Sequence, residues 1–196
     1  MTSILVVCTG NVCRSPMAEG FLRTALERRL GADAPAVTSA GTAGWEGSGA
    51  MPESVQAARE RGVEIGGHVA QRLVPGMAGS ADLVVCMAAE HRDAITATEP
   101  GVARAVFTLK ELARLLEQLP PVGAGHPDLL ARIRDADRLR RDGFPGNPLD
   151  EDVVDPLGMP LDSYRAIAWE LDEWSDRVAE GLAGPVPVPT TSRPEA

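Results

Sequence analysis

The chain opens with an apolar run, a tight loop and a helix in direct succession. Ile4–Val7 is a continuous apolar segment, typical of a central parallel strand that is covered on both faces. The loop Cys8–Ser15 (CTGNVCRS) follows. Pro16 then opens a predicted helix over 16–30, whose apolar residues recur at three- and four-residue spacing until Gly31. A strand that passes through a loop into a helix is the repeating unit of α/β folds.

Strand and helix signals continue to alternate along the chain. Helices are predicted at 52–61, 88–96 and 109–118. Further apolar runs predict strands at Val37–Ala40, Asp82–Met87 and Arg104–Thr108. We therefore expect an α/β fold with a doubly wound, four-stranded parallel sheet and helices on both faces. Ligands of such sheets bind beyond the carboxyl ends of the strands, which is where the first loop lies.

This first loop has the composition of an anion site. Backbone N–H groups of a tight loop can point inward and form a concave nest that suits phosphate oxygens. Gly10 and Asn11 are the residues best able to adopt the left-handed backbone angles that such a loop needs. Arg14 can donate two parallel hydrogen bonds to a tetrahedral oxyanion. Ser15 is expected at the N-cap and Pro16 at the first position of a helix whose N-terminus points at the nest.

Cys8 stands at the head of the loop, where its sulfur could act as a nucleophile. The helix dipole and Arg14 favour the ionised form of a thiol, and a thiolate held under a phosphate is a phosphoryl acceptor. A single cysteine at the end of a buried strand is more often only a small core residue. Glycine, arginine, serine and proline at this spacing favour the functional interpretation.

Cys8–Glu19 (CTGNVCRSPMAE) resembles the phosphate-binding loop of the low-molecular-weight protein tyrosine phosphatases. The resemblance covers most of residues 2–118 and 150–182, and it implies a two-step phosphatase without a metal or other cofactor. Further segments resemble the family in order along the chain: Ser39–Thr42 with Trp45, Gly67–His68, Asp82–His91 (DLVVCMAAEH) and Asp155–Pro156.

The resemblance also implies a role for each matching residue. Cys8 would attack phosphorus, Arg14 and the loop amides would hold the transferring oxygens, and Asp155 would serve as general acid and then as base. Trp45 would lie at the mouth of the site. The loop residues expected to bind substrate are Thr9, Gly10, Asn11, Val12 and Cys13. The residues expected to support the loop are Asn11, Ser15, Ser39 and His68.

The choice of Asp155 as general acid needs more than its local sequence. An acidic residue before a proline is commonly a solvated turn residue, and Asp150 and Asp152 are competing candidates. Pro156 restricts the backbone of Asp155 and can fix the direction of its carboxyl group. Together with the resemblance, this restriction favours Asp155.

The resemblance leaves two substrate classes open. Tyrosine-directed members commonly carry an aromatic pair after Asp-Pro, forming one wall of a slot for the phenyl ring, whereas Leu157 and Gly158 follow here. Trp45 could supply the other wall. Val12 is apolar, as in tyrosine-directed members, while relatives that hydrolyse phosphoarginine carry threonine there. The Asp-Pro-x-Gly pattern nevertheless resembles those relatives. We predict a phosphotyrosine phosphatase, with a protein arginine phosphatase as the alternative.

Two alternative functions, an arsenate reductase and a binding module, and one redox hypothesis are also considered. Thioredoxin-linked arsenate reductases share this fold and loop, but they need additional cysteines near the third strand. Cys86 lies inside the predicted strand and is expected to be a buried core residue. Cys8 and Cys13 could form a reversible disulfide, as such pairs do in the family. A non-catalytic phosphate-binding module would keep the nest but misplace Asp155.

Composition restricts the partners. A formal net charge of −9 disfavours nucleic acids, whose phosphates are bound by clustered Lys and Arg. Three cysteines without a signal-peptide pattern favour reduced thiols, and no apolar stretch is long enough to span a membrane. We expect a cytoplasmic enzyme that acts on phosphorylated proteins and binds inorganic phosphate or a similar oxyanion, with no nucleic-acid or membrane partner.

The chain is expected to form one phosphatase-like domain over 1–182. A helical insertion at about 119–147, with its helix near 128–142, exceeds what a minimal member needs and either covers the site or is a surface excursion. The proline-rich tail 183–196 is expected to be disordered or extended. The last helix should bury one face from Tyr164 to Leu182 and leave Trp169 on the other.

Overall fold

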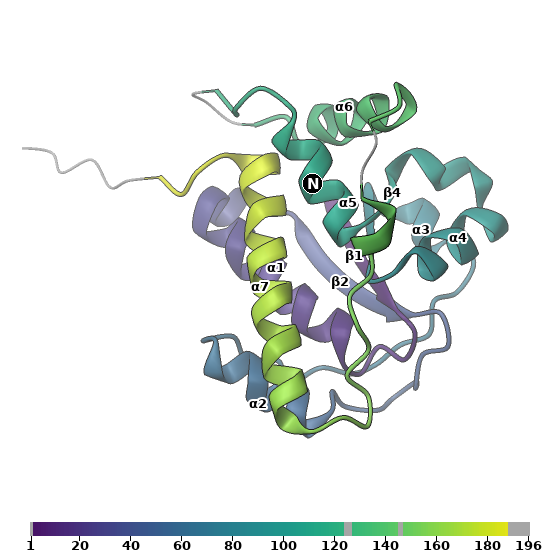
Figure 1. Ribbon diagram of the computed structural model, residues 1–196, viewed down its shortest axis with the longest axis vertical. Helices are drawn as coiled ribbons and strands as arrows, with labels where there is room; N and C mark the ends of the chain where they lie inside the picture. Colours follow the sequence, from purple (N-terminus) through teal and green to yellow (C-terminus); the bar gives the residue numbers. More distant parts are fainter. Residues whose placement is uncertain (1, 124–126, 145–146, 188–196) are drawn as a thin grey trace, which may run out of the picture.

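The computed structural model describes residues 2–123, 127–144 and 147–187. At its centre lies a parallel sheet in the order β2-β1-β3-β4 (Figure 1), and the predicted doubly wound, four-stranded architecture is confirmed. Val7 pairs with Ala40 on one side and Cys86 on the other, so Cys8 ends the strand in the middle of the sheet. The strands are β1 (Ser3–Cys8), β2 (Ala36–Gly41), β3 (Leu83–Cys86) and β4 (Val106–Thr108).

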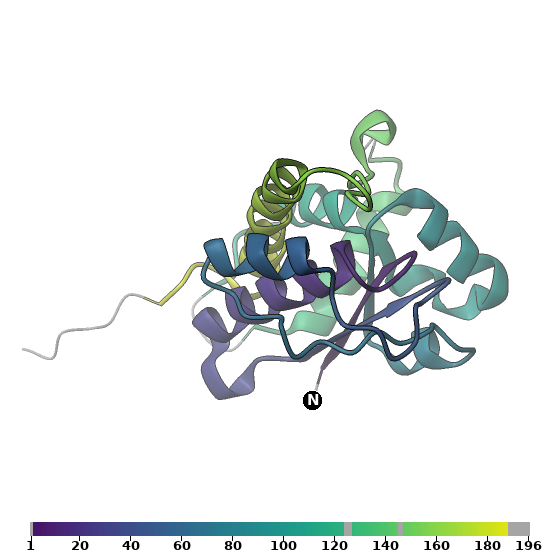
Figure 2. The same cartoon turned by 90° about the horizontal axis from the view of Figure 1, so that it is seen from below.

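Helices cover both faces of the sheet (Figures 1 and 2). Alternate side chains of β1 separate the two layers, since Ile4 and Val6 pack toward α1, α5 and α7 whereas Leu5 and Val7 pack toward α3 and α4. The helices at 16–30, 52–61, 88–96 and 109–118 are each found within two residues of their predicted bounds. The helices are α1 (Arg14–Leu30), α2 (Pro52–Glu60), α3 (Met77–Ser80), α4 (Ala89–Thr98), α5 (Leu109–Glu117), α6 (Leu129–Arg141) and α7 (Leu161–Ala183).

Two local predictions were wrong. The strand predicted from Arg104 begins only at Val106, because Pro100–Ala105 forms a 3-10 helix in which Pro100 starts the turn. Ser15 is not the N-cap, since α1 begins at Arg14 and places Ser15 within the first turn. The hydroxyl group of Ser15 serves the loop instead of the helix end. Two further 3-10 helices, Gly31–Asp33 and Pro148–Asp150, were not predicted.

α6 lies within the bounds predicted for the insertion helix, and the Asp128 carboxylate caps it by accepting from the N–H of Ala131 at 2.9 Å. α6 packs at the start of β4, where Arg140 donates to the carbonyl groups of Ala103 and Val106, both at 2.8 Å. It lies at the top of Figure 1, near the end of α7. Residues 124–126 and 145–146 of the predicted insertion and 188–196 of the predicted tail lie outside the described residues.

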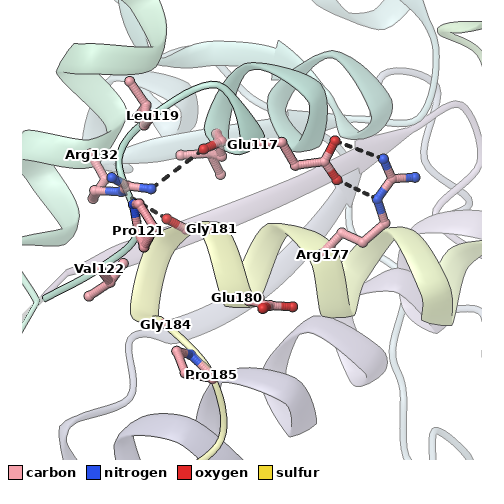
Figure 3. Close-up of a pocket in the computed structure, with 11 residues that line it drawn as sticks. Glu117, Leu119, Pro121, Val122, Arg132, Arg177, Glu180, Gly181, Gly184 and Pro185 are labelled. Carbon is pink, nitrogen blue, oxygen red and sulfur yellow. Dashed lines mark hydrogen bonds and ion pairs between the residues drawn. The ribbon is translucent and has the colours of Figure 1, made fainter.

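α7 buries the predicted face against the core and leaves Trp169 exposed. Its end borders a hollow of ≈ 270 Å³ between α5, α7 and the segment 119–122 (Figure 3). In this hollow Arg177 binds Glu117 at 2.6 Å, and Arg132 donates to the carbonyl of Gly181 at 2.8 Å. No helix among residues 2–123, 127–144 and 147–187 is both long and apolar enough to cross a bilayer.

Candidate active site

The loop between β1 and α1 curls into a nest in the middle of the sheet edge. Asn11 adopts the left-handed region at φ 56°, as predicted, whereas Gly10 is not among the residues with positive φ. Gly41 at the end of β2 lies against the loop so closely that a Cβ there would be 2.9 Å from the Asn11 nitrogen. The end of β2 therefore supports the nest by direct backbone contact.

The side chain of Asn11 is fully buried behind the nest. Its amide nitrogen donates to Ser15 Oγ at 2.9 Å and to Ser39 Oγ at 2.8 Å, while its oxygen accepts from the Gln71 N–H at 2.8 Å. His68 Nε2 lies 2.8 Å from the Asn11 carbonyl oxygen, to which it can only donate. The side chain of Asn11 thus supports the loop, and Asn11 is not one of the described residues that line the mouth.

Cys8 ends β1 with its sulfur at the bottom of the nest. The sulfur lies 2.9 Å from Ser15 Oγ and accepts from the Asn11 N–H at 3.3 Å. Since Ser15 Oγ already accepts from the Asn11 amide, its own hydrogen is free to be donated to the sulfur. This geometry provides two donors for a thiolate.

Arg14 is the buried cation of the site. One guanidinium nitrogen donates to the Val153 carbonyl at 3.1 Å, and the other contacts Asp155 Oδ2 at 2.6 Å and Thr9 Oγ1 at 3.2 Å. Its Nε is buried without a hydrogen-bond partner among the described residues. An unpaired buried donor costs about 1–3 kcal/mol, which an oxyanion in the nest would recover.

The nest opens through a small mouth of ≈ 70 Å³. Trp45 is held at this mouth by its backbone N–H, which donates to the Gly10 carbonyl at 3.0 Å. Leu157 lies across from the nest, and its N–H donates to Asp155 Oδ1 at 3.2 Å, which fixes the carboxyl group beside Arg14. The residues that line the mouth are Cys8, Thr9, Gly10, Val12, Cys13, Arg14, Trp45, Asp155 and Leu157.

The prediction did not include two buried side chains beside the nest. His91 Nε2 lies 2.9 Å from Thr9 Oγ1, and burial together with the charge of Arg14 lowers the pKa of His91. His91 closes a segment that matched the family, but its sequence gave no sign of this contact. Tyr164 places its hydroxyl 3.9 Å from Cys13 Sγ, and its position on the buried face of the last helix was the only sequence signal.

The remaining cysteines are buried and reduced. Cys86 lies inside β3, as predicted, and burial raises its pKa. Burial also raises the pKa of Cys13 to about 11, which keeps this thiol protonated at neutral pH. The disulfide between Cys8 and Cys13 stays a prediction.

The sequence itself matches known proteins. Residues 3–120 match the family described as low molecular weight phosphotyrosine protein phosphatase. Over 110 residues the chain is 38% identical to the probable low molecular weight protein-tyrosine-phosphatase EpsP of Ralstonia solanacearum, covering 56% of this chain and 72% of the relative. Over 180 residues it is 31% identical to the protein-arginine-phosphatase of Bacillus subtilis, covering 91% and 95%.

Solved structures agree with these matches. The low molecular weight protein tyrosine phosphatase from T. tengcongensis superposes with a TM-score of 0.68 at 33% identity, covering 93% of this chain and all of that one. The family match, the superposition and the loop geometry thus all include β1, the Cys8 loop and α1. The chain belongs to the low molecular weight phosphotyrosine protein phosphatase family and is a phosphatase.

Proposed function

We propose that this protein hydrolyses phosphotyrosine on proteins through a cysteinyl-phosphate intermediate on Cys8. The observation that carries this proposal is the pairing, in one cavity, of the Cys8 sulfur with the buried and unpartnered Nε of Arg14. A nucleophile and an unsatisfied cationic donor facing one small space suit a tetrahedral dianion better than any neutral group.

In the first step the Cys8 thiolate attacks phosphorus opposite the leaving oxygen. The S–P bond forms, the P–O bond to the phenol breaks, and Asp155 gives its proton to the departing oxygen. Arg14 and the loop amides hold the three equatorial oxygens, on which charge is spread in a loose phosphoryl transition state. The Ser15 hydroxyl, 2.9 Å from the sulfur, stabilises the thiolate before attack.

In the second step water attacks the cysteinyl phosphate. Asp155, now ionised, accepts a proton from the water, the new P–O bond forms and the S–P bond breaks, which returns Cys8 as a thiolate and releases inorganic phosphate. The 42% exposure of the Asp155 side chain leaves it accessible to this water.

The lining of the mouth favours an aryl phosphate. Val12, Trp45 and Leu157 present apolar surface around the nest, and a phenyl ring needs such surface on both sides. Leu157 forms an aliphatic wall where tyrosine-directed members commonly have an aromatic one. We place the substrates in the cytoplasm, where reducing conditions keep a thiol nucleophile available.

Phosphoarginine is the second candidate. The match to the Bacillus subtilis protein-arginine-phosphatase extends over 91% of this chain, whereas the tyrosine phosphatase from Ralstonia solanacearum matches 56%. Asp155 at the mouth could also contact a guanidinium group. Comparing kcat/KM for phosphotyrosine and phosphoarginine peptides of otherwise equal sequence tests the choice, and a higher value for phosphoarginine would reverse our assignment.

Turnover itself is tested with an aryl phosphate. Cys8→Ser should abolish phosphate release while binding of vanadate or phosphate is retained. A wild-type protein that binds phosphate but releases none from any aryl phosphate would be a binding module. Reduction of arsenate coupled to thioredoxin would instead make it a reductase.

A further inference from the structure

We propose that Lys110 is a positioning residue for the general acid: its ammonium group holds the segment that carries Asp155 onto α5. This inference rests on the proposed function, because it assumes that Asp155 protonates the leaving group. Lys110 lies outside the mouth and touches none of the reacting atoms.

The placement of Lys110 follows from the start of α5. Thr108 ends β4 at the carboxyl edge of the sheet and caps α5 through a reciprocal pair of hydrogen bonds with Glu111, both 3.2 Å. Lys110 is therefore fixed in the first turn of a rigidly capped helix, on the same edge of the sheet as the Cys8 loop.

The ammonium group of Lys110 is buried and fully paired. Only 4% of the residue is exposed, and its nitrogen lies 2.8 Å from Asp150 Oδ1, 3.0 Å from the Asp152 carbonyl and 2.6 Å from Glu170 Oε1. An ammonium group has three N–H donors, and three acceptors meet it here. Two of these acceptors belong to the segment before Asp155, and the third belongs to α7.

Further contacts continue from Lys110 toward the acid. The Asp152 carboxylate accepts from the Ala89 N–H at the start of α4 at 2.7 Å. Val153 is buried, donates to the Met87 carbonyl at 2.8 Å and accepts from Arg14. Asp150, Asp152 and Val153 are thus each held by other parts of the fold, and Lys110 holds the first part of this series.

Arg114 and Arg92 add cations to the same segment from the surface. Arg114 contacts Asp150 at 2.5 Å, and Arg92 contacts Glu151 at 3.2 Å. Both guanidinium groups are more exposed than the Lys110 ammonium, so water can replace them at lower cost. Without Lys110, the Asp152 carbonyl would lose its donor and Glu170 its cation, and the start of the segment that carries Asp155 would be held less firmly.

The test compares two leaving groups. Phenyl phosphate releases a phenol that needs a proton, whereas 2,4-dinitrophenyl phosphate releases an anion that is stable without one. For Lys110→Met we expect kcat/KM to fall about 10-fold for phenyl phosphate and to change less than about 2-fold for the dinitrophenyl ester. Asp155→Asn, the direct loss of the acid, should show the same split with a fall of about 100-fold for phenyl phosphate.

Glu170→Gln is the matched control, since it weakens the same ammonium cluster from the α7 side and leaves both contacts to the acid segment. We expect kcat/KM for both esters to stay within about 2-fold of the wild type. Lys110→Gln, which keeps an N–H donor on a side chain one atom shorter, is measured in parallel so that a poorly folding methionine variant does not decide the result.

The outcomes separate the two proposals. Equal losses on both esters in the Lys110 variants, or no loss on either, would overturn the positioning role while Asp155→Asn still shows its split. If Asp155→Asn shows no split, or if Cys8→Ser retains turnover, the proposed function itself is wrong.

Discussion

At the scale of single residues, the site depends on how one guanidinium group is shared. Arg14 contacts Val153, Asp155 and Thr9, yet its Nε has no partner among the described residues. Its two terminal nitrogens hold Val153 and Asp155, the proposed general acid, while Nε is left for an oxyanion. In the proposed mechanism, substrate binding and the placement of Asp155 are therefore coupled through this one side chain.

Arg14→Lys should lower kcat/KM for an aryl phosphate about 100-fold, although the positive charge is kept. A lysine cannot reach Val153 and Asp155 and still offer two parallel donors to phosphate. Steady-state kinetics and vanadate affinity measure the effect. A variant with at least half of the wild-type kcat/KM would show that charge alone suffices.

His91 should make stability depend on pH. Burial and the charge of Arg14 lower its pKa below the usual value of about 6.5, against the opposing charges of Glu90, Asp152 and Asp155. The unfolded chain therefore takes up a proton at a higher pH than the folded one. The free energy of unfolding should fall as the pH drops below about 6.5 and rise toward neutral pH.

His91→Asn should flatten this slope, because asparagine can still contact Thr9 but does not titrate. Urea unfolding at pH 7, 6 and 5 measures the difference. Parallel slopes for the two proteins would assign the pH dependence to other groups.

At the scale of elements, α1 depends on a glycine that is not at a turn. A Cβ at Gly20 would lie 2.8 Å from Val63 Cγ1 and 2.9 Å from Ile65 Cγ2. Both neighbours are β-branched and cannot rotate away freely. Helix α1 therefore packs closely against the segment after α2 because Gly20 has no side chain.

Gly20→Ala should destabilise the protein by up to about 2 kcal/mol. Alanine is the better helix former by about 1 kcal/mol, but overpacking of about 1–3 kcal/mol opposes this gain. Denaturant unfolding measures the net effect. Glu27→Ala at an exposed position of α1 is the control and should stay within about 0.5 kcal/mol. A stabilised Gly20→Ala protein would show that Val63 and Ile65 move without cost.

The sequence predicted the structure best where the interacting residues are close together along the chain. The order of strands and helices, the nest with its left-handed Asn11, and the buried Cys86 were expected from local residue types and spacing. Ser15 was misjudged because a serine before Pro16 suits both an N-cap and a donor to sulfur. Lys110 and His91 gave no local signal, since their partners lie far away along the chain and meet them only after folding.

At the scale of the whole molecule, one buried arginine joins the two ends of the fold. Arg29 near the end of α1 binds both carboxylate oxygens of Asp176 at 2.9 and 3.0 Å and donates to the Gly184 carbonyl at 2.9 Å. Arg29 also holds the pKa of Asp176 below its ordinary value. The C-terminal helix α7 is thereby fixed to α1, which follows the Cys8 loop.

Arg29→Met should lower the free energy of unfolding by about 2 kcal/mol at pH 7. This is less than the loss of a fully buried ion pair would cost, because the Asp176 side chain is 40% exposed. The stabilisation of a carboxylate with a lowered pKa is present above its unfolded value and is lost as the pH falls through the folded one. The difference between variant and wild type should thus shrink below about pH 4. Thermal unfolding from pH 7 to 3 measures it, and a constant difference would mean that packing alone is lost.

The position of α6 has a practical consequence. The helix contacts the start of β4 and the end of α7, and among the described residues none that lines the mouth belongs to it. Its outward arginines, such as Arg134 and Arg138, are well exposed. A tether or fluorophore attached there would touch none of the described residues that line the mouth, so the protein could be immobilised with its mouth accessible.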